Sequence, residues 1–384
     1  MKKIKICTKL LIVFMAISFS GCETWKFITS RGDMSKYVPK EAKNSIFPPS
    51  IDVSNDDKVY FAYSTTKGRS ICSMDINTGQ LYQITEDGNN DGFPVVSNDG
   101  EKIIFERGNI IGNSKLFIVN ANGSGCKALI DNDMYILDIV LSKNDSVIYF
   151  IGGALYSDST NVLKNYNKCQ DVFSVGIDGS NFKRITTNCI TSWIYDLKLI
   201  DDDHLLVSIG SELDFDRKIS NDYKMIKKYY DKNQKGFHRK PYLNSFLGLI
   251  NIRTGEMEEI KITETSKPYK EPLTRWQKKH KIPVPLLTNS AYNQEKNEFL
   301  YGNYDFFKFN YKDKIINYSF TNDSIGIYNY KFLYNQNKLI GVIDNDGDAE
   351  LILFDIEKNL IDRRLEIDTT KFSPSPNKTI FIND

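Results

Sequence analysis

Short polar turns recur along this chain between short apolar segments, and this repetition constrains the fold more than any other feature. In the clearest unit, Phe93–Val96 leads through the turn Asn98-Asp99-Gly100 into the apolar run Ile103-Ile104-Phe105, and a second hairpin follows at Lys115–Gly123. Asn, Asp and Gly favour tight turns, and apolar runs bounded by such turns are typical of strands. Four short strands in roughly 40 residues correspond to one blade of a β-propeller. The sequence therefore predicts an all-β propeller of four-stranded antiparallel blades.

The order of the turns predicts seven blades. With the strands of a blade called A to D from the inside outwards, seven turns suit A–B hairpins and seven suit C–D hairpins. The series begins with a C–D turn and ends with an A–B turn, so we expect a closing blade built from residues 24–38 and 369–382. This closure would cover the sheet edges that an open ring exposes. A six-bladed ring with loose terminal segments is the alternative. The A–B turns follow Ser54, Ser97, Ser142, Ile200, Tyr292, Tyr334 and Ser373, and the C–D turns lie near Gly32, Gly79, Gly123, Gly179, Gly255, Lys312 and Asn359.

Two of these repeats resemble a known family. The segment Pro94–Phe105 followed by Asn122-Gly123 resembles the repeat of TolB-type β-propellers, and Asp178-Gly179 followed by Arg184-Ile185-Thr186 resembles the end of another such repeat. The resemblance is good between about residues 46 and 190 and holds only in outline elsewhere. TolB-type repeats occur in bacterial envelope proteins, mostly as binding platforms and sometimes fused to enzymes. The resemblance implies a propeller fold, whereas fold alone does not assign function.

The first 21 residues are expected to be a lipoprotein signal peptide, followed by a single propeller domain over residues 22–384. A basic start precedes the apolar stretch Leu10–Phe19, which is too short to span a bilayer. The stretch ends at Phe19-Ser20-Gly21-Cys22, which resembles the site where a lipoprotein is cleaved and its cysteine lipidated. A plain secretory signal that happens to precede Cys22 is the alternative. An Asp directly after the cysteine would resemble an inner-membrane retention signal. This chain has Glu23 there, so delivery to the outer membrane is favoured.

The charge balance of the chain bears on nucleic-acid binding, and the positions of its cysteines bear on disulfide formation. The chain has 50 basic and 49 acidic residues, which gives no reason to expect nucleic-acid binding. Cys169 and Cys189 flank the Asp178-Gly179 turn at similar distances, so they would face each other in a hairpin. An exported protein meets an oxidising compartment, where these thiols could form a disulfide. Two unpaired thiols remain the alternative.

Motifs that carry catalytic or cofactor chemistry are missing from the sequence. The chain has three histidines and no pair at metal-binding spacing, no Gly-x-Ser-x-Gly elbow and no phosphate-binding glycine loop. Asp344, Asp346 and Asp348 alternate as in a calcium loop, but they also lie between two apolar runs, as in an ordinary hairpin turn. We favour the hairpin, and expect no cofactor.

Two insertions are the best candidates for a binding surface. Residues 211–245 interrupt the fourth blade between strands B and C, and residues 263–286 precede the next blade. Both connections leave the same face of an up-and-down propeller, and loops this long are usually functional or disordered. Aromatic rings among basic groups suit sugars or acidic polymers, although the same residues could instead pack the insertions onto the ring. The candidate ligand-face residues are Tyr229, Tyr230, His238, Arg239, Trp276 and His280.

These observations favour a lipid-anchored, exported propeller that acts as a non-catalytic binding or scaffolding module at the bacterial cell envelope. Its partners would be the membrane, reached through the lipid, and an envelope protein or glycan. The basic residues of the two insertions could also face anionic lipid head groups, because the chain would enter the propeller from Cys22 at the same face. The alternative is a propeller-fold polysaccharide lyase or other carbohydrate-active enzyme, which would need clustered histidines or a metal site.

Overall fold

The computed structural model describes strands and turns, and no helix, within the part of the chain that it covers. This part starts at Ser45, and the segment before it is a separate unit that lies outside the described residues. The described ranges are 45–65, 67–86, 88–109, 113–131, 134–154, 170–186, 192–211, 244–260, 264–265, 290–293, 296–301, 305–313, 315–321, 326–333, 337–345, 348–367 and 373–374.

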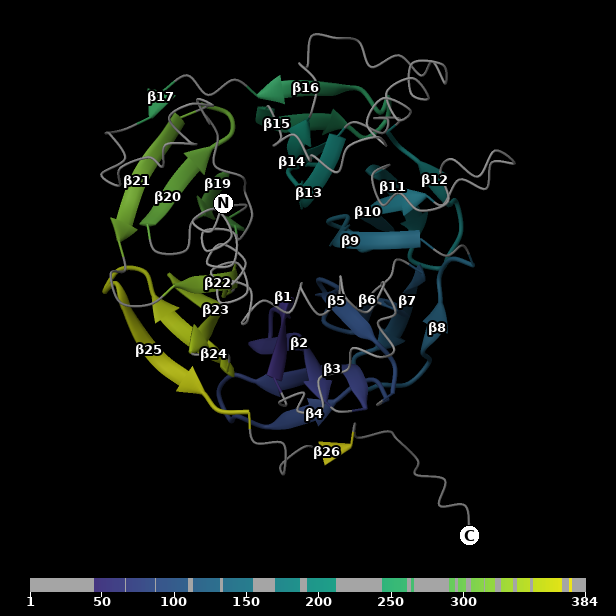
Figure 1. Cartoon of the computed structure of the whole chain (residues 1–384), viewed down its shortest axis with the longest axis vertical. Helices are drawn as coiled ribbons and strands as arrows, with labels where there is room; N and C mark the ends of the chain where they lie inside the picture. The colour runs from purple at the N-terminus through teal and green to yellow at the C-terminus, as the bar shows by residue number, and fades with distance from the viewer. Residues whose placement is uncertain are drawn as a thin grey trace, which may run out of the picture. The chain divides into compact units, whose positions relative to one another are not determined.

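Six four-stranded antiparallel blades follow one another along the chain (Figure 1). Blade 1 comprises β1 (Ser45–Val53), β2 (Lys58–Thr65), β3 (Gly68–Asp75) and β4 (Leu81–Gln83). Blade 2 comprises β5 (Asp91–Val96), β6 (Lys102–Asn109), β7 (Asn113–Asn120) and β8 (Lys127–Ala128). Blade 3 comprises β9 (Met134–Leu141), β10 (Val147–Ala154), β11 (Gln170–Gly176) and β12 (Lys183–Arg184).

The second half repeats this order. Blade 4 comprises β13 (Ser192–Leu199), β14 (His204–Ser211), β15 (Asn244–Asn251) and β16 (Met257–Ile260). Blade 5 comprises β18 (Ser290–Asn293), β19 (Glu298–Tyr301), β20 (Asp305–Asn310) and β21 (Ile315–Thr321). Blade 6 comprises β22 (Ile327–Phe332), β23 (Lys338–Asn345), β24 (Asp348–Asp355) and β25 (Leu360–Leu365). Two short strands, β17 (Glu264–Thr265) and β26 (Ser373–Pro374), each add to the outer edge of a blade in parallel orientation.

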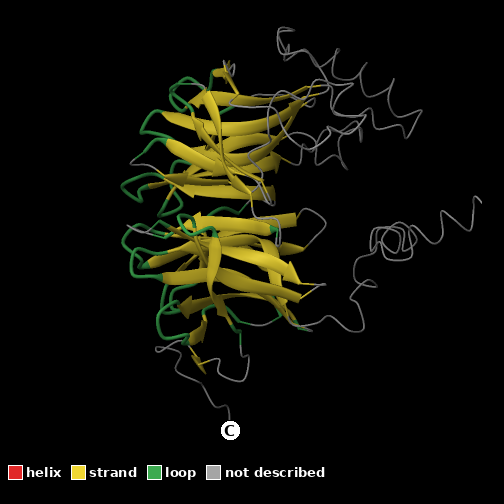
Figure 2. Cartoon of the chain, turned by 90° about the vertical axis from the view of Figure 1, so that its left-hand side faces the viewer, coloured by secondary structure: helices red, strands yellow, loops and turns green. Residues whose placement is uncertain are grey.

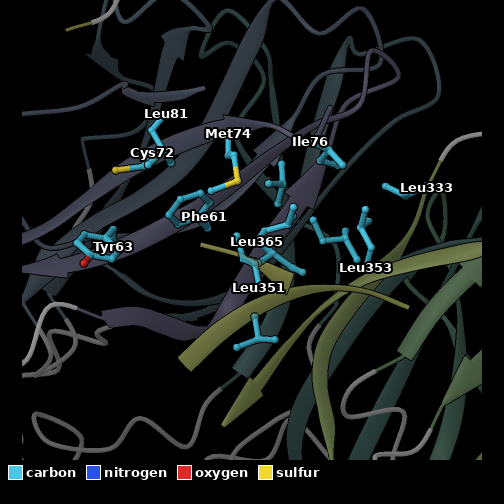
Figure 3. Close-up of a cluster of buried hydrophobic side chains, with 14 residues drawn as sticks. Phe61, Tyr63, Cys72, Met74, Ile76, Leu81, Leu333, Leu351, Leu353 and Leu365 are labelled. Carbon is cyan, nitrogen blue, oxygen red and sulfur yellow. The ribbon is translucent and has the colours of Figure 1, made fainter. Parts of the chain in front are cut away.

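A separate buried apolar cluster fills each of the six junctions between neighbouring blades. In β2, Phe61 packs towards blade 6 while its neighbours Tyr60 and Ala62 pack towards blade 2. Successive side chains of a strand point to opposite faces, and both faces of a blade are covered, so the strand reads as an unbroken apolar run. Figure 3 shows the cluster that joins blade 1 to blade 6. This cluster closes the ring between the first and the last blade.

The prediction of a seven-bladed ring is wrong, and the described strands form six blades. Instead of starting a new blade as strand A, Ser373 pairs with Tyr82 on the outer edge of blade 1. The expected partner hairpin near Gly32 lies outside the described residues. An apolar segment with a turn predicts a hairpin, but whether it joins a seventh blade depends on long-range pairing that local pattern does not encode.

The predicted hairpins of the other blades are confirmed, as are their four-stranded antiparallel sheets. Six A–B turns and six C–D turns fall between the expected strands, and they lie together on one face (Figure 2). Left-handed backbone is required at several of them, with φ of 57° at Asp57 and at Asp145 and 74° at Gly100. Asp, Asn and Gly tolerate this conformation better than other residues, which is why turn composition located the blades.

Candidate functional site

The sequence-predicted site residues fall almost entirely outside the described part of the chain. Within it, Asp344 and Asp348 lie on either side of the β23–β24 hairpin, where Asp344 pairs with Ala349 and Asn345 pairs with Asp348. The residues outside are Cys22, Cys169, Cys189, Tyr229, Tyr230, His238, Arg239, Trp276, His280 and Asp346. The lipidation, disulfide, ligand-face and calcium assignments therefore remain predictions.

The ends of the described strands show where the inserted stretches join the ring. Residues 212–243 connect the end of β14 to the start of β15, and residues 266–289 connect β17 to the start of β18. In each blade, strands A and C begin, and strand B ends, at the face of the propeller opposite the A–B turns. Because β17 runs parallel to β21, a D strand, it ends at this face as well. Both stretches are thus attached at the same face of the propeller.

Charged side chains lie on the inner strands of four blades. Lys331 of β22 places its Nζ 3.3 Å from Asp52 Oδ1 of β1, and Lys198 of β13 places its Nζ 3.9 Å from Asp138 Oδ2 of β9. Asp196 of β13 adds a third carboxylate. These strands are the innermost of their blades (Figure 1). We call Asp52, Asp138, Asp196, Lys198 and Lys331 the axial charges.

Two of the axial carboxylates also bond the backbone of the next blade. Asp52 Oδ2 accepts a hydrogen bond of 2.9 Å from the N–H of Val96, and Asp138 Oδ2 accepts one of 2.8 Å from the N–H of Leu197. The inner strands β1, β5, β9, β13 and β22 each contain a register shift, which leaves backbone groups without a partner in their own ladder. The two carboxylates therefore link blade 1 to blade 2 and blade 3 to blade 4.

Electrostatic coupling extends across the ring. Burial works to lower the pKa of Lys331, but Asp52 and Asp138 outweigh it and raise that pKa. Lys331 and Asp138 lie on the inner strands of blades 6 and 3, and the Asp138 carboxylate contributes to the raised pKa of Lys331. Burial raises the pKa of Asp196 to about 6, against the effect of Lys198. Its enclosed Oδ2 has no hydrogen-bond partner. The axial charges can hold the inner strands of neighbouring blades together through ion pairs and hydrogen bonds to the backbone.

A second charged cluster lies buried between blades 1 and 2. Arg107 donates from Nε and Nη2 to the two oxygens of Asp91, over 2.7 and 2.9 Å, and Asp91 is fully buried. Arg69 and Glu106, each 8% exposed, interact beside them. A Cβ on Gly92 would lie 3.2 Å from Glu106 Oε2 and 3.5 Å from Arg69 Nη1, so glycine leaves room for this pair. We call Arg69, Asp91, Glu106 and Arg107 the blade 1–2 ion cluster.

The electrostatics of the blade 1–2 ion cluster follow from its burial. Burial raises the pKa of Glu106 to about 6, while Arg69 and a hydrogen bond from Ser114 oppose the rise. Burial lowers the pKa of Arg69, and both carboxylates oppose this. The hydrogen bonds to Asp91 raise the pKa of Arg107, which also lies over the Phe105 and Phe117 rings at 5.3 and 4.6 Å from their centroids. The two positive and two negative groups of the cluster compensate one another's charge. Buried charges need such partners, because an unpaired charge away from water is strongly destabilising.

Blade 3 has a smaller polar contact of the same kind. Arg184 forms an ion pair with the buried carboxylate of Asp171, whose other oxygen accepts a hydrogen bond of 2.8 Å from the Thr186 hydroxyl. That hydroxyl in turn accepts a 3.0 Å bond from the N–H of Val172. This contact explains why Arg-Ile-Thr follows the C–D turn in the sequence repeat. The residues tie the outer end of the blade to its third strand.

The described ranges contain one histidine and two cysteines. Among these residues, no group of three or more His, Cys, Asp or Glu side chains is arranged to hold a metal ion. His204 is the one histidine of the chain that lies within them, with its Nδ1 2.9 Å from Asp201 Oδ1 at an A–B turn. Cys72 is buried and Cys126 is exposed. None of the described segments is a helix long and apolar enough to cross a membrane.

Comparison with known proteins finds similarity to solved structures at low sequence identity. No family model and no curated protein matches the chain. Similar solved structures include TolB from Acinetobacter baumannii, with 14% identity and a TM-score of 0.44 over 70% of this chain and 53% of TolB. Others are a nidogen/laminin complex (7%, 0.49, 79% of this chain and 92% of the other) and oligogalacturonate lyase with manganese (12%, 0.41, 80% and 88%).

The chain spans about half the length of that TolB, and at these identities the likeness concerns the fold alone. The class of protein is nevertheless defined by its six blades. It is a six-bladed β-propeller, as the strand pairing shows, and a TolB is among the solved structures to which it is similar.

The axial charges and the blade 1–2 ion cluster were missed by the sequence analysis. Glu106 and Arg107 follow an apolar run, so they look like ordinary solvated residues at a strand end. The partner of Glu106, Arg69, lies in another blade, 37 positions before it in the sequence. A possible signal was Gly92 inside a strand, since such a glycine often marks a close approach by another group.

Proposed function

We propose that this protein is a lipid-anchored, exported β-propeller that serves as a non-catalytic binding or scaffolding module at the bacterial cell envelope. The ring would be a rigid support, and the stretches 212–243 and 266–289 would form the binding surface. Cys22, lipidated and made N-terminal by removal of residues 1–21, would supply the anchor.

The observation that carries this proposal is a difference between the blades, whose strands are fixed by contacts with one another, and the long connections between strands. In the blade 1–2 ion cluster the buried charged groups pair with one another, and the half-buried Asp52 and Asp138 accept hydrogen bonds from the backbone of the next blade. Such contacts favour a fixed ring geometry. The long connections, by contrast, are attached at one face, and binding residues are often found on loops held by a rigid scaffold.

The chemistry of these connections favours an acidic or sugar-containing partner. Tyr229, Tyr230 and Trp276 offer flat rings for stacking, and Arg239 and the neighbouring lysines offer positive charge. A glycan with carboxylate groups would use both kinds of contact.

The experiment uses the mature chain with Cys22→Ser, to keep the protein in solution. Two variants shorten residues 215–240 or 269–286 to a Gly/Ser linker, and a control variant places the same linker in the 155–169 connection of blade 3. Binding to an immobilised uronic-acid polymer and to solubilised envelope fractions is measured for each. Loss of at least tenfold in affinity is expected for the first two variants and not for the control. Equal binding by all four proteins would contradict the assignment of the binding surface.

Single substitutions then separate binding from packing. Trp276→Ala should weaken binding about fivefold or more, as expected for an aromatic anchor, with an unchanged unfolding midpoint. A lowered midpoint with intact binding would show that Trp276 packs against the ring instead. The anchor itself is tested by fractionation, where wild type should stay with membranes in high salt and Cys22→Ser should not.

A further inference from the structure

The outermost strand of blade 1 comes from the other end of the described chain. After β25 ends blade 6 at Leu365, the chain reaches blade 1 and β26 pairs in parallel with β4. Ser373 lies opposite Tyr82 and Pro374 opposite Gln83. In Figure 1, β26 lies outside β4, at the edge of the ring. The added strand covers a sheet edge that would otherwise be open.

The composition of β26 makes this pairing short and weak. Within the described residues β26 pairs two positions with β4, and Pro374 has no N–H to donate to a ladder. A proline on the outermost strand also discourages the addition of a further strand. The segment therefore protects the edge of β4 while holding it through few hydrogen bonds.

Blade 5 shows that a parallel fifth strand is a recurrent feature of this ring. There β17 pairs with β21, with Glu264 opposite Ile315 and Thr265 opposite Ile316. That strand lies between two blades in the sequence and is tethered at both ends. By contrast, β26 follows the last blade, so a competing segment could replace it without disturbing any blade.

We propose that the outer edge of β4 is a binding site for an extended peptide in parallel orientation, and that the chain's own residues 373–374 occupy this site in cis. The peptide that fits has a small residue opposite the half-buried Tyr82 and a proline after it, as in Phe372-Ser373-Pro374. Strand addition of this kind takes affinity from main-chain hydrogen bonds and specificity from alternate side chains. This site is independent of the binding surface proposed above, because β4 belongs to blade 1.

The test uses a chain that ends at Ile367 and a fluorescent peptide with the sequence of residues 368–380. Binding to the shortened chain should be at least tenfold tighter than binding to the full-length chain, where the tethered segment competes at a high effective concentration. A control peptide with Ser373→Pro has no N–H at either paired position and should bind at least tenfold more weakly than the natural peptide. Equal binding to both chains, or equal binding of both peptides, would overturn the proposal.

A second pair of variants covers the case in which the shortened chain fails to fold. In the full-length protein, Ser373→Pro should free the edge, speed hydrogen exchange of the β4 amides at least threefold and raise affinity for the natural peptide. Ser373→Ala keeps the N–H and should match wild type in both measurements. If Ser373→Pro leaves exchange of β4 and peptide binding unchanged, the edge is not held by β26 and the proposal is wrong.

Discussion

Blade 1 meets its two neighbours through junctions of different kinds. Towards blade 2, an apolar cluster is joined by the buried blade 1–2 ion cluster, and the two blades are consecutive in the chain. Towards blade 6, a larger apolar cluster around Phe61 and Leu351 carries most of the contact (Figure 3). Polar contacts across this junction include the Lys331–Asp52 pair at the inner strands and a hydrogen bond from Arg363 to the Ile76 carbonyl.

This difference shows how the ring stays closed although no described blade is built from both ends of the chain. At the junction of blades 6 and 1, no short D–A connection keeps the two blades together, so non-directional apolar burial has to supply the stability. The cleft of about 280 Å³ at this junction contains an ion pair in its lining, with Lys338 Nζ 2.7 Å from Asp362 Oδ2. At the blade 1–2 junction, buried charges fix the relative placement of blades that the chain already keeps adjacent.

The largest expected effect is at the junction of blades 6 and 1. Phe61 is fully buried there, so Phe61→Ala should lower the free energy of unfolding by about 4 kcal/mol, from lost burial and the cavity left behind. Urea titration followed by tryptophan fluorescence measures this. Phe61→Leu keeps most of the volume and should cost about 1 kcal/mol. Equal losses for the two variants would show that apolar burial is not what holds this junction.

Removing one charge from the blade 1–2 ion cluster should cost slightly less. Arg69→Met leaves Glu106 and Asp91 buried with one cation fewer, and we expect a loss of about 3 kcal/mol. The double variant Arg69→Met/Glu106→Met removes both partners and should recover part of that loss. A double variant less stable than the sum of the single changes would contradict the paired arrangement.

The same cluster should make stability depend on pH. The pKa of Glu106 is raised by burial to about 6 in the folded chain, so the folded state binds this proton more tightly than the unfolded state. The contribution of Glu106 to stability is therefore full below about pH 4.5 and is lost as the pH rises to about 6, a change of about 2 kcal/mol. Asp196 adds a slope of the same sign. Glu106→Gln should flatten the curve over this range, whereas an unchanged curve would show that Glu106 is not the titrating group.

The smallest effect is expected from β26. Ending the chain at Ile367 removes a pairing of two residues and should lower the free energy of unfolding by about 1–2 kcal/mol, in line with a few net hydrogen bonds. Differential scanning calorimetry of the shortened and full-length chains measures the change. A loss as large as that of Phe61→Ala would mean that β26, and not the apolar cluster, closes the ring.

The turns and apolar runs were predictable because they depend on local chemistry. Asp57 and Gly100 occupy left-handed positions that few other residues tolerate, so the sequence located the blades one by one. The number of blades was not predictable in this way. The segment around Ser373 has the local pattern of a strand, but its pairing with Tyr82 joins residues almost 300 positions apart. Similarly, Asp52 and Lys331 become partners only once the ring has closed.

The candidate site was less predictable than the fold for a related reason. A charged residue in a strand, such as Asp138 or Lys198, is expected on a solvated face, and its partner lies in another blade. No spacing rule links such residues in a single sequence.

The most direct test of the six-bladed ring is a disulfide between β4 and β26, in the double variant Tyr82→Cys/Ser373→Cys. Paired strands lie about 4.8 Å apart, within the range of about 4.4–6.8 Å between Cα atoms that a disulfide spans. Mass spectrometry of the unreduced digest should find a bond between positions 82 and 373 within one chain, and neither single variant should give it. In a seven-bladed ring, residues 369–373 would form an inner strand, away from the outer edge of blade 1. A folded double variant that forms no such bond under oxidising conditions would contradict the six-bladed closure.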